Sequence, residues 1–190
     1  MKQNIMNLAI FRNKTNILAA AALLSAGSIS AQTFSDFSYT GKDKIYTNNP
    51  LKENEFYSPI LQGCYPDPSI TRKGDDYYLV NSSFSMFPGV PIFTSKDLVN
   101  WKQLGHVLDR PSQLKVEKGG VSQGIYAPDI KYNKYNDTFY MITTQIAGGI
   151  GNMVVKTKDP AKGWSEVQKL NFDGIDPSIF FDDNGKAYIV

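Results

Sequence analysis

The chain has 190 residues, of which 42% are hydrophobic and 13% aromatic, and its formal net charge at pH 7 is +2. Its basic residues are scattered along the chain rather than clustered in one segment, which argues against a nucleic-acid-binding surface. Cys64 is the only cysteine, which excludes an intrachain disulfide and a zinc cluster of cysteines, and we expect Cys64 to be a small buried hydrophobe.

The first element predicted along the chain is an export signal. Residues 1–31 contain three basic residues and no acidic one, and their apolar run, residues 17–24, is too short to span a bilayer. Small residues follow at 28–31, so we interpret residues 1–31 as a cleaved signal peptide rather than a retained membrane anchor. Its removal leaves 17 basic and 18 acidic residues, a formal charge of −1. The sequence thus predicts a secreted or periplasmic protein without a membrane span.

Residues 32–58 form the next segment. They are polar and rich in turn-forming residues, and they show no apolar alternation. We interpret them as a leader or linker that wraps the following domain, residues 59–190.

A repeat organises residues 59–190. Shifting the sequence by 62 residues superimposes four features of the first unit on the second: Asp67 on Asp129, residues 77–80 on 139–142, residues 95–97 on 157–159 and, with a slip of one residue, Trp101 on Trp164. No helical periodicity follows the first thirty or so residues. The sequence therefore predicts an all-β domain, and the long period predicts the blades of a β-propeller with loop insertions.

A third unit begins at Asp176, where the sequence Asp-Pro-Ser-Ile of residues 67–70 returns at residues 176–179. Its strands are joined by Asn184-Gly185, a pair that suits the positive φ angles of a type I′ hairpin turn. The chain stops within the next strand-like run, residues 186–190, so we expect the sequence to be a truncated part of a longer protein.

Asp67 and Asp176 are the candidate catalytic residues. Each opens a predicted strand, so the repeat places two carboxylates at equivalent inner positions. Two positioned carboxylates are the minimum for acid/base cleavage of a glycosidic bond. The residues alone leave a second interpretation open, because an aspartate at the start of a strand commonly caps a turn. We favour this structural role for Asp129, although the shift of 62 residues makes it the geometric equivalent of Asp67.

Other single residues are assigned structural roles. His106 is the only histidine, and it lies in a strand-like run, so we interpret it as structural rather than as substrate-lining. Trp101 and Trp164 occupy equivalent positions, which favours core packing over sugar stacking. Asp97 and Asp159 are interpreted as turn formers for the same reason.

Six motifs occur in order along the domain: PDPSI at 66–70, GDDYY at 74–78, FPGVP at 87–91, SKDLVNW at 95–101, GIYAPD at 124–129 and DPS at 176–178. Together they resemble glycoside hydrolase family forty-three, and more narrowly its β-xylosidase and α-L-arabinofuranosidase members. This resemblance implies a five-bladed β-propeller with an inverting hydrolase site at one axial end of its channel. The chain would hold about the first two and a half blades.

The resemblance also implies roles for the two aspartates. Asp67 matches the general base, and prolines on both sides restrict its backbone. Asp176 matches the aspartate that orients the general acid and raises its pKa. The family's general acid is a glutamate on a later blade, and neither Glu117 nor Glu166 matches its motif. The chain as given is therefore expected to be inactive.

Phe84 and Tyr126 are the candidate substrate-binding residues. By the resemblance, Phe84 walls the sugar subsite, and aromatic faces suit the apolar side of a sugar ring. Tyr126 replaces a tryptophan that many relatives carry, and Met86 replaces a bulky aromatic residue, so the choice between xylose and arabinose stays open. The expected partner is a xylo- or arabino-oligosaccharide, with no cofactor, metal or nucleic acid.

Two alternative functions are kept. One is a sugar-binding propeller without catalytic activity, which the sequence beyond residue 190 would distinguish. The other is a retaining propeller enzyme that cleaves or transfers fructosyl units, but the Asn-Asp-Pro-Asn signature of that class is absent from the chain.

Overall fold

The computed structural model describes residues 43–52, 55–115, 119–146 and 148–190, all of which belong to one compact unit. The predicted signal peptide, residues 1–31, and residues 32–42 of the predicted leader lie outside the described residues. The described part of the leader is mostly exposed and contains one helical turn, α2 (Lys44–Thr47). Across the described residues, no helix has the length and apolar character needed to cross a membrane.

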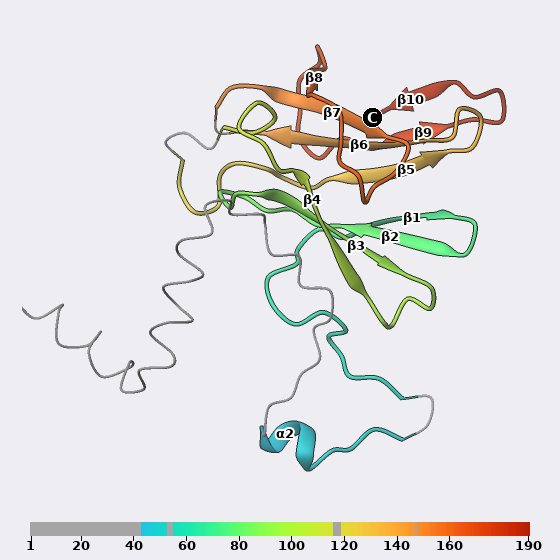
Figure 1. The fold of residues 1–190 in the computed structure, drawn as a ribbon. Coiled ribbons are helices and arrows are strands. Elements are labelled where there is room, and N and C mark those ends of the chain that lie inside the picture. The colour runs from blue at the N-terminus through green and yellow to red at the C-terminus, as the bar shows by residue number, and fades with distance from the viewer. Residues whose placement is uncertain (1–42, 53–54, 116–118, 147) are drawn as a thin grey trace, which may run out of the picture. The chain divides into compact units, whose positions relative to one another are not determined.

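Two four-stranded antiparallel sheets and a hairpin make up the rest of the described chain (Figure 1). The first sheet contains, in spatial and chain order, β1 (Ser69–Lys73), β2 (Asp76–Val80), β3 (Gly89–Ser95) and β4 (Lys102–Leu108). The second sheet contains β5 (Asp129–Asn133), β6 (Thr138–Gln145), β7 (Gly151–Thr157) and β8 (Gln168–Lys169). The hairpin contains β9 (Ile179–Phe181) and β10 (Ala187–Ile189). The all-β prediction is confirmed, and each sheet is a meander of the kind that forms a propeller blade.

The hydrophobic core is one cluster that both sheets share. Its buried members are Val80, Val90, Ile92, Val107, Leu108 and Leu114 from the first unit, and Ile125, Ile130, Phe139, Met141, Met153, Val155 and Trp164 from the second. Burying one such large side chain contributes about 1.5–3 kcal/mol to the free energy of unfolding. Trp164 packs in this core as predicted. Trp101 is only half-buried, and its indole N–H closes the turn on the carbonyl of Leu98 at 2.9 Å.

We call the first strands of the three sheets, β1, β5 and β9, the inner strands. Side chains of one inner strand accept hydrogen bonds from the edge of the next. β1 lies beside β5 (Figure 1), and the backbone amides of Ile130 and Tyr132 donate to Ser69 Oγ at 3.1 Å and to Thr71 Oγ1 at 2.9 Å. The amide of Ile179, at the start of β9, donates in the same way to the Asp129 carboxylate at 2.9 Å. Because unpaired edge amides are costly and prone to wrong pairing, these contacts fix the three inner strands to one another.

Strand pairing corrects the equivalence predicted for Asp129. Ser69 is paired with Val80 and Asp129 with Ile142, and Val80 and Ile142 are 62 residues apart. The position equivalent to Asp129 is therefore Ser69, and not Asp67. The cause is a difference in turn length, because two residues join β1 to β2 and four residues join β5 to β6.

The turns confirm one prediction and correct another. Asp97 accepts hydrogen bonds from the amides of Val99 and Asn100, so it caps its turn as predicted, and Asp159 does the same for the amide of Ala161. The type I′ turn predicted at Asn184-Gly185 is wrong, because Gly185 has a positive φ of 75° whereas Asn184 does not.

The carboxylate of Asp182 explains this hairpin turn. It accepts hydrogen bonds from the amides of Asn184 and Lys186, both at 2.9 Å. The amide of Gly185 donates to the carbonyl of Asp182 at 3.0 Å. This arrangement is a type I turn followed by a single left-handed glycine, which is the pattern of a longer hairpin loop.

Candidate active site

Asp67 and Asp176 occupy equivalent places at the start of the first and third inner strands. Asp67 lies two residues before Ser69, which pairs with Val80, and Asp176 lies two residues before Ser178, whose amide and carbonyl bond to Val190. Both aspartates have left-handed backbones, with φ angles of 52° and 56°. Asp129, in contrast, lies within a strand. Non-glycine residues in the left-handed region are uncommon and cluster at functional sites.

A buried amide fixes the segment that carries Asp67. Asn81, which follows β2, donates from Nδ2 to the carbonyls of Tyr65 and Pro66 at 2.9 and 3.1 Å. The backbone amide of Ser82 also donates to Pro66, and the hydroxyl of Ser82 donates to the Asp67 carboxylate. With prolines on both sides, this carboxylate is held in one orientation.

A second buried amide fixes the segment that leads to Asp176. Asn152, on β7, donates from Nδ2 to the carbonyls of Phe172 and Gly174 at 3.1 and 3.3 Å. Its Oδ1 atom accepts from Thr144 Oγ1 at 2.6 Å. Neither Asn152 nor Asn81 was predicted from the sequence to hold these segments. The available signal was an asparagine inside or directly after an apolar strand, where a buried amide needs partners.

The structure brings the two predicted substrate contacts together. The rings of Phe84 and Tyr126 meet edge to face, with centroids 6.2 Å apart. Phe84 and Ile125 exchange backbone hydrogen bonds of 2.9 and 3.0 Å, which join the first sheet's loop to the segment before β5. Gly124 permits this approach, because a Cβ atom there would lie 2.1 Å from the carbonyl oxygen of Phe84. Phe84 lies two residues along the chain from Ser82, the hydrogen-bond partner of Asp67.

Other candidate residues lie outside this arrangement. Glu166 accepts a hydrogen bond from Arg110 at 2.9 Å, which lowers the pKa of Glu166 and favours its ionised form. Glu117 lies outside the described residues. His106 is on β4, the outermost strand of the first sheet, where burial lowers its pKa. Cys64 is exposed, contrary to our prediction, because it lies in an irregular segment before β1 rather than in a strand.

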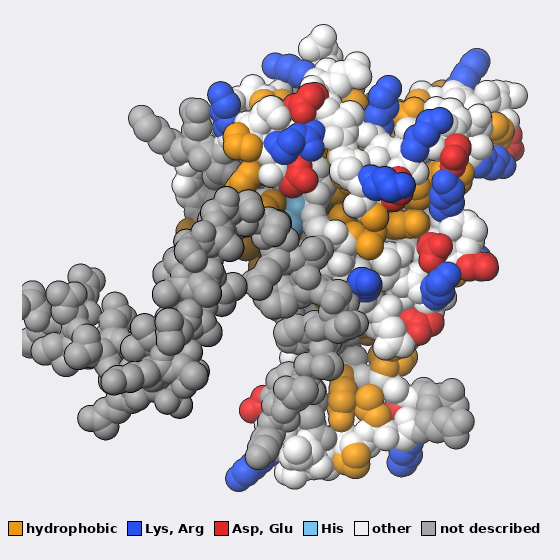
Figure 2. Space-filling model, in the orientation of Figure 1, with side chains coloured by type: hydrophobic (Ala, Val, Ile, Leu, Met, Phe, Trp, Pro, Cys, Tyr) orange, Lys and Arg blue, Asp and Glu red, His pale blue; other side chains and the backbone are white. Residues whose placement is uncertain are grey.

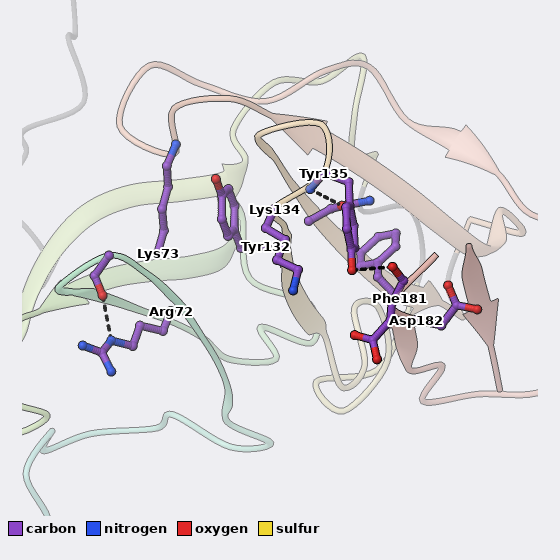
Figure 3. Close-up of a pocket in the computed structure, with 10 residues that line it drawn as sticks. Arg72, Lys73, Tyr132, Lys134, Tyr135, Phe181 and Asp182 are labelled. Atoms are coloured by element: carbon purple, nitrogen blue, oxygen red, sulfur yellow. Dashed lines mark hydrogen bonds between the residues drawn. The ribbon is translucent and has the colours of Figure 1, made fainter. Parts of the chain in front are cut away.

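A cavity of about 350 Å³ lies at the other ends of the inner strands (Figure 3). It is lined by the last residues of β1, β5 and β9 and by the turns that follow them, whereas Asp67 and Asp176 precede β1 and β9. Lys73 pairs with Asp137, and the ammonium of Lys134 lies 5.0 Å from the centre of the Tyr135 ring.

Within the part of the chain that the structure describes, no group of three or more His, Cys, Asp or Glu residues is arranged to hold a metal ion.

Comparison with known proteins places these features in a family. The family model described as glycosyl hydrolases family 43 matches residues 56–190. A xylosidase/arabinosidase of Butyrivibrio fibrisolvens is 57% identical over 136 residues, which cover 70% of this chain and 26% of that protein. A non-reducing end alpha-L-arabinofuranosidase of Bacteroides ovatus is 44% identical over 146 residues, 75% of this chain and 27% of that protein.

A solved structure shows the same relationship. The crystal structure of a GH43_12 protein retrieved from a capybara gut metagenome has 73% sequence identity and a TM-score of 0.75, and the match covers 83% of this chain and 30% of that one. The chain therefore spans less than a third of the length of each of these proteins. It belongs to glycosyl hydrolases family 43, and its two four-stranded sheets and the hairpin of β9 and β10 are the N-terminal part of a five-bladed β-propeller.

Proposed function

We propose that the protein carrying this chain is a glycoside hydrolase that cleaves β-xylosidic or α-L-arabinofuranosidic bonds in hemicellulose oligosaccharides. The names of the relatives support this substrate class, since they include a xylosidase/arabinosidase and an arabinofuranosidase. The observation that carries the proposal is the matched placement of Asp67 and Asp176, both left-handed and both at the start of an inner strand. Left-handed non-glycine residues persist only where their surroundings hold them, and they cluster at active sites.

In the proposed reaction Asp67 acts as the general base. It removes a proton from a water molecule whose oxygen bonds to the anomeric carbon on the face opposite the leaving group. The bond from that carbon to the glycosidic oxygen breaks, and the leaving oxygen takes a proton from the general acid. Base and acid must stand about 6.5–9.5 Å apart to admit the water, and the anomeric configuration inverts.

Asp176 is proposed to act on the general acid rather than on the sugar. The acid must stay protonated near neutral pH, and a neighbouring anionic carboxylate raises its pKa by like-charge repulsion. By the family resemblance, the acid itself is a glutamate on a later blade. The described residues of this chain therefore supply the base, Asp67, and the aspartate that acts on the general acid, Asp176, but not the proton donor itself.

The aromatic pair is proposed to contact the sugar. Phe84 and Tyr126 come from two different blades and meet beside the segment that bonds Asp67. Their faces suit the apolar side of a pentose ring. On the face shown in Figure 2, basic and acidic side chains are interspersed rather than gathered by sign, which suits a neutral oligosaccharide better than a polyanion.

The proposal is tested with Asp67→Ala in the full-length protein. Loss of a general base typically lowers the rate by about a hundredfold or more, so turnover of an aryl β-xyloside or aryl α-L-arabinofuranoside should fall at least that far. Asp75→Ala is the matched control, because Asp75 lies in the turn at the other end of β1 and its side chain is 90% exposed. Near-normal turnover by Asp67→Ala would remove Asp67 from the mechanism.

A further inference from the structure

Equivalent positions on the three inner strands meet at a single carboxylate. Asp129 Oδ1 accepts hydrogen bonds from Ser69 Oγ at 2.7 Å and from Lys131 Nζ at 2.6 Å. Asp129 Oδ2 accepts from Ser178 Oγ at 3.0 Å and from the backbone amide of Ile179 at 2.9 Å. The carboxylate thus joins the first, second and third blades, and each of its oxygens holds a serine from a different blade.

Both serines belong to the repeated Asp-Pro-Ser motif. Ser69 follows Asp67, and Ser178 follows Asp176, in each case with one intervening proline. Because proline restricts its own backbone and that of the preceding residue, each aspartate is tied to its serine by a stiff link. One carboxylate with a hydrogen bond at each oxygen keeps the two hydroxyls within about 8 Å of each other.

We infer that Asp129 is a positioning residue that sets the separation of the Asp67 and Asp176 carboxylates. It acts through Ser69 and Ser178 and does not touch the substrate. The expected fall in turnover rests on the proposed function, whereas the expected change in the distance between the two carboxylates does not. It also explains the serine of the Asp-Pro-Ser motif, whose hydroxyl donates to the carboxylate of Asp129 in the second blade.

These contacts require Asp129 to be ionised. Burial opposes its ionisation, but the hydrogen bonds from Lys131, Ser69 and the Ile179 amide outweigh that effect and hold the pKa of Asp129 below its ordinary value. At neutral pH the carboxylate is therefore ionised and accepts at both oxygens. An asparagine of the same size would place an N–H₂ group where one of these oxygens lies. That group cannot accept a hydrogen bond, so both donors at that position would lose their acceptor.

The test uses Asp129→Asn, Ser178→Ala and the double variant of the full-length protein, with an aryl glycoside as substrate. Misplacement of a catalytic group by about 1 Å can cost about a hundredfold, so Asp129→Asn should lower kcat about 10- to 100-fold while KM stays within about threefold. The double variant should be no slower than Asp129→Asn, because both changes break the same contact. If Asp129→Asn does not fold, the fall in kcat of Ser178→Ala carries the same test.

Asp97→Asn is the matched control. Asp97 also accepts four hydrogen bonds, from Ser95 Oγ, the amides of Val99 and Asn100, and Asn100 Nδ2, but it lies in the turn between β3 and β4. Its variant should lose thermal stability and keep kcat within about twofold. Equal falls of kcat in Asp97→Asn and Asp129→Asn would show a general stability effect and would overturn the inference.

Crystal structures of the full-length wild type and of Asp129→Asn separate this inference from the proposed function. The distance between the Cγ atoms of Asp67 and Asp176 should differ between them by roughly 0.5 Å or more, the tolerance of a productive site. An unchanged distance would overturn the inference even if the wild type is active. A changed distance would support it even if the wild type cleaves neither glycoside.

Discussion

Backbone conformation separates Asp67 and Asp176, which precede β1 and β9, from Asp129, which is the first residue of β5. The first two are left-handed, with φ angles of 52° and 56°, and the third is extended within β5. A left-handed non-glycine residue costs on the order of 1–3 kcal/mol, and the surrounding contacts must hold it there. The amides of Asn81 and Asn152 supply such contacts for the two segments.

The stability of the protein should depend on pH through Asp129. Its folded-state pKa lies below the unfolded value of about 3.9, so its contribution to stability is present above about pH 4 and is lost as the pH falls through the folded-state pKa. The difference in Tm between the full-length wild type and Asp129→Asn should be constant from about pH 5 to 8 and should narrow below about pH 4. A difference that widens as the pH falls would contradict this assignment.

The repeated sequence motif points to the two candidate catalytic residues, but the repeat predicted the wrong equivalent for Asp129. Asp67 and Asp176 share the same tetrapeptide, so their equivalence is visible in the sequence. Asp129 follows a proline as Asp67 does, but two extra residues in the turn after β5 move it into register with Ser69. That shift is expressed in strand pairing and cannot be seen in a sequence aligned without gaps. The contacts of Ser69 and Ser178 with Asp129 are long-range and were equally hidden.

The strands could be predicted from the sequence, whereas several of the connections between them could not. Runs such as residues 77–80 and 139–142 are rich in aromatic and apolar residues, and both lie on strands of their sheets. The turn at Asn184-Gly185 was mispredicted because the side chain of Asp182 supplies the hydrogen bonds that choose its type. Side-chain caps of this kind depend on geometry that dipeptide preferences do not contain.

Gly124 should be essential for the contact between the two blades' loops. Its φ is 123°, and a Cβ atom would lie 2.1 Å from the Phe84 carbonyl oxygen, so Gly124→Ala must push Phe84 away from Tyr126. We expect a loss of about 1–3 kcal/mol in the free energy of unfolding and a severalfold rise in KM for the aryl glycoside. Denaturant titration and steady-state kinetics of the full-length protein measure these two quantities.

The control for this prediction is Gly105→Ala. Gly105 also has a positive φ, 141°, but a Cβ atom there meets nothing within 4 Å. This variant therefore carries the backbone strain without the clash, and its KM should match that of the wild type. Equal KM values for Gly124→Ala and Gly105→Ala would show that the Phe84 contact does not shape the substrate site.

The exposed hairpin of β9 and β10 should decide how residues 32–190 behave when expressed alone. Ile175, Phe180, Tyr188 and Val190 are each at least half exposed, and β9 and β10 form a sheet of two strands. Blades that cannot bury their faces against neighbours expose apolar surface and free edges. We expect this fragment to aggregate or fold poorly and to show no hydrolysis above background. Light scattering, thermal melting and an aryl glycoside assay measure this, and a soluble, cooperatively melting and active fragment would refute the prediction.

In the proposed reaction, water activated by Asp67 attacks the anomeric carbon directly. Proton NMR of the full-length protein acting on an aryl glycoside identifies the anomer that is formed first, before mutarotation. Direct attack from the face opposite the leaving group predicts an inverted anomer. A retained anomer would instead require a covalent glycosyl-enzyme intermediate, and it would contradict the assignment of Asp67 as a general base.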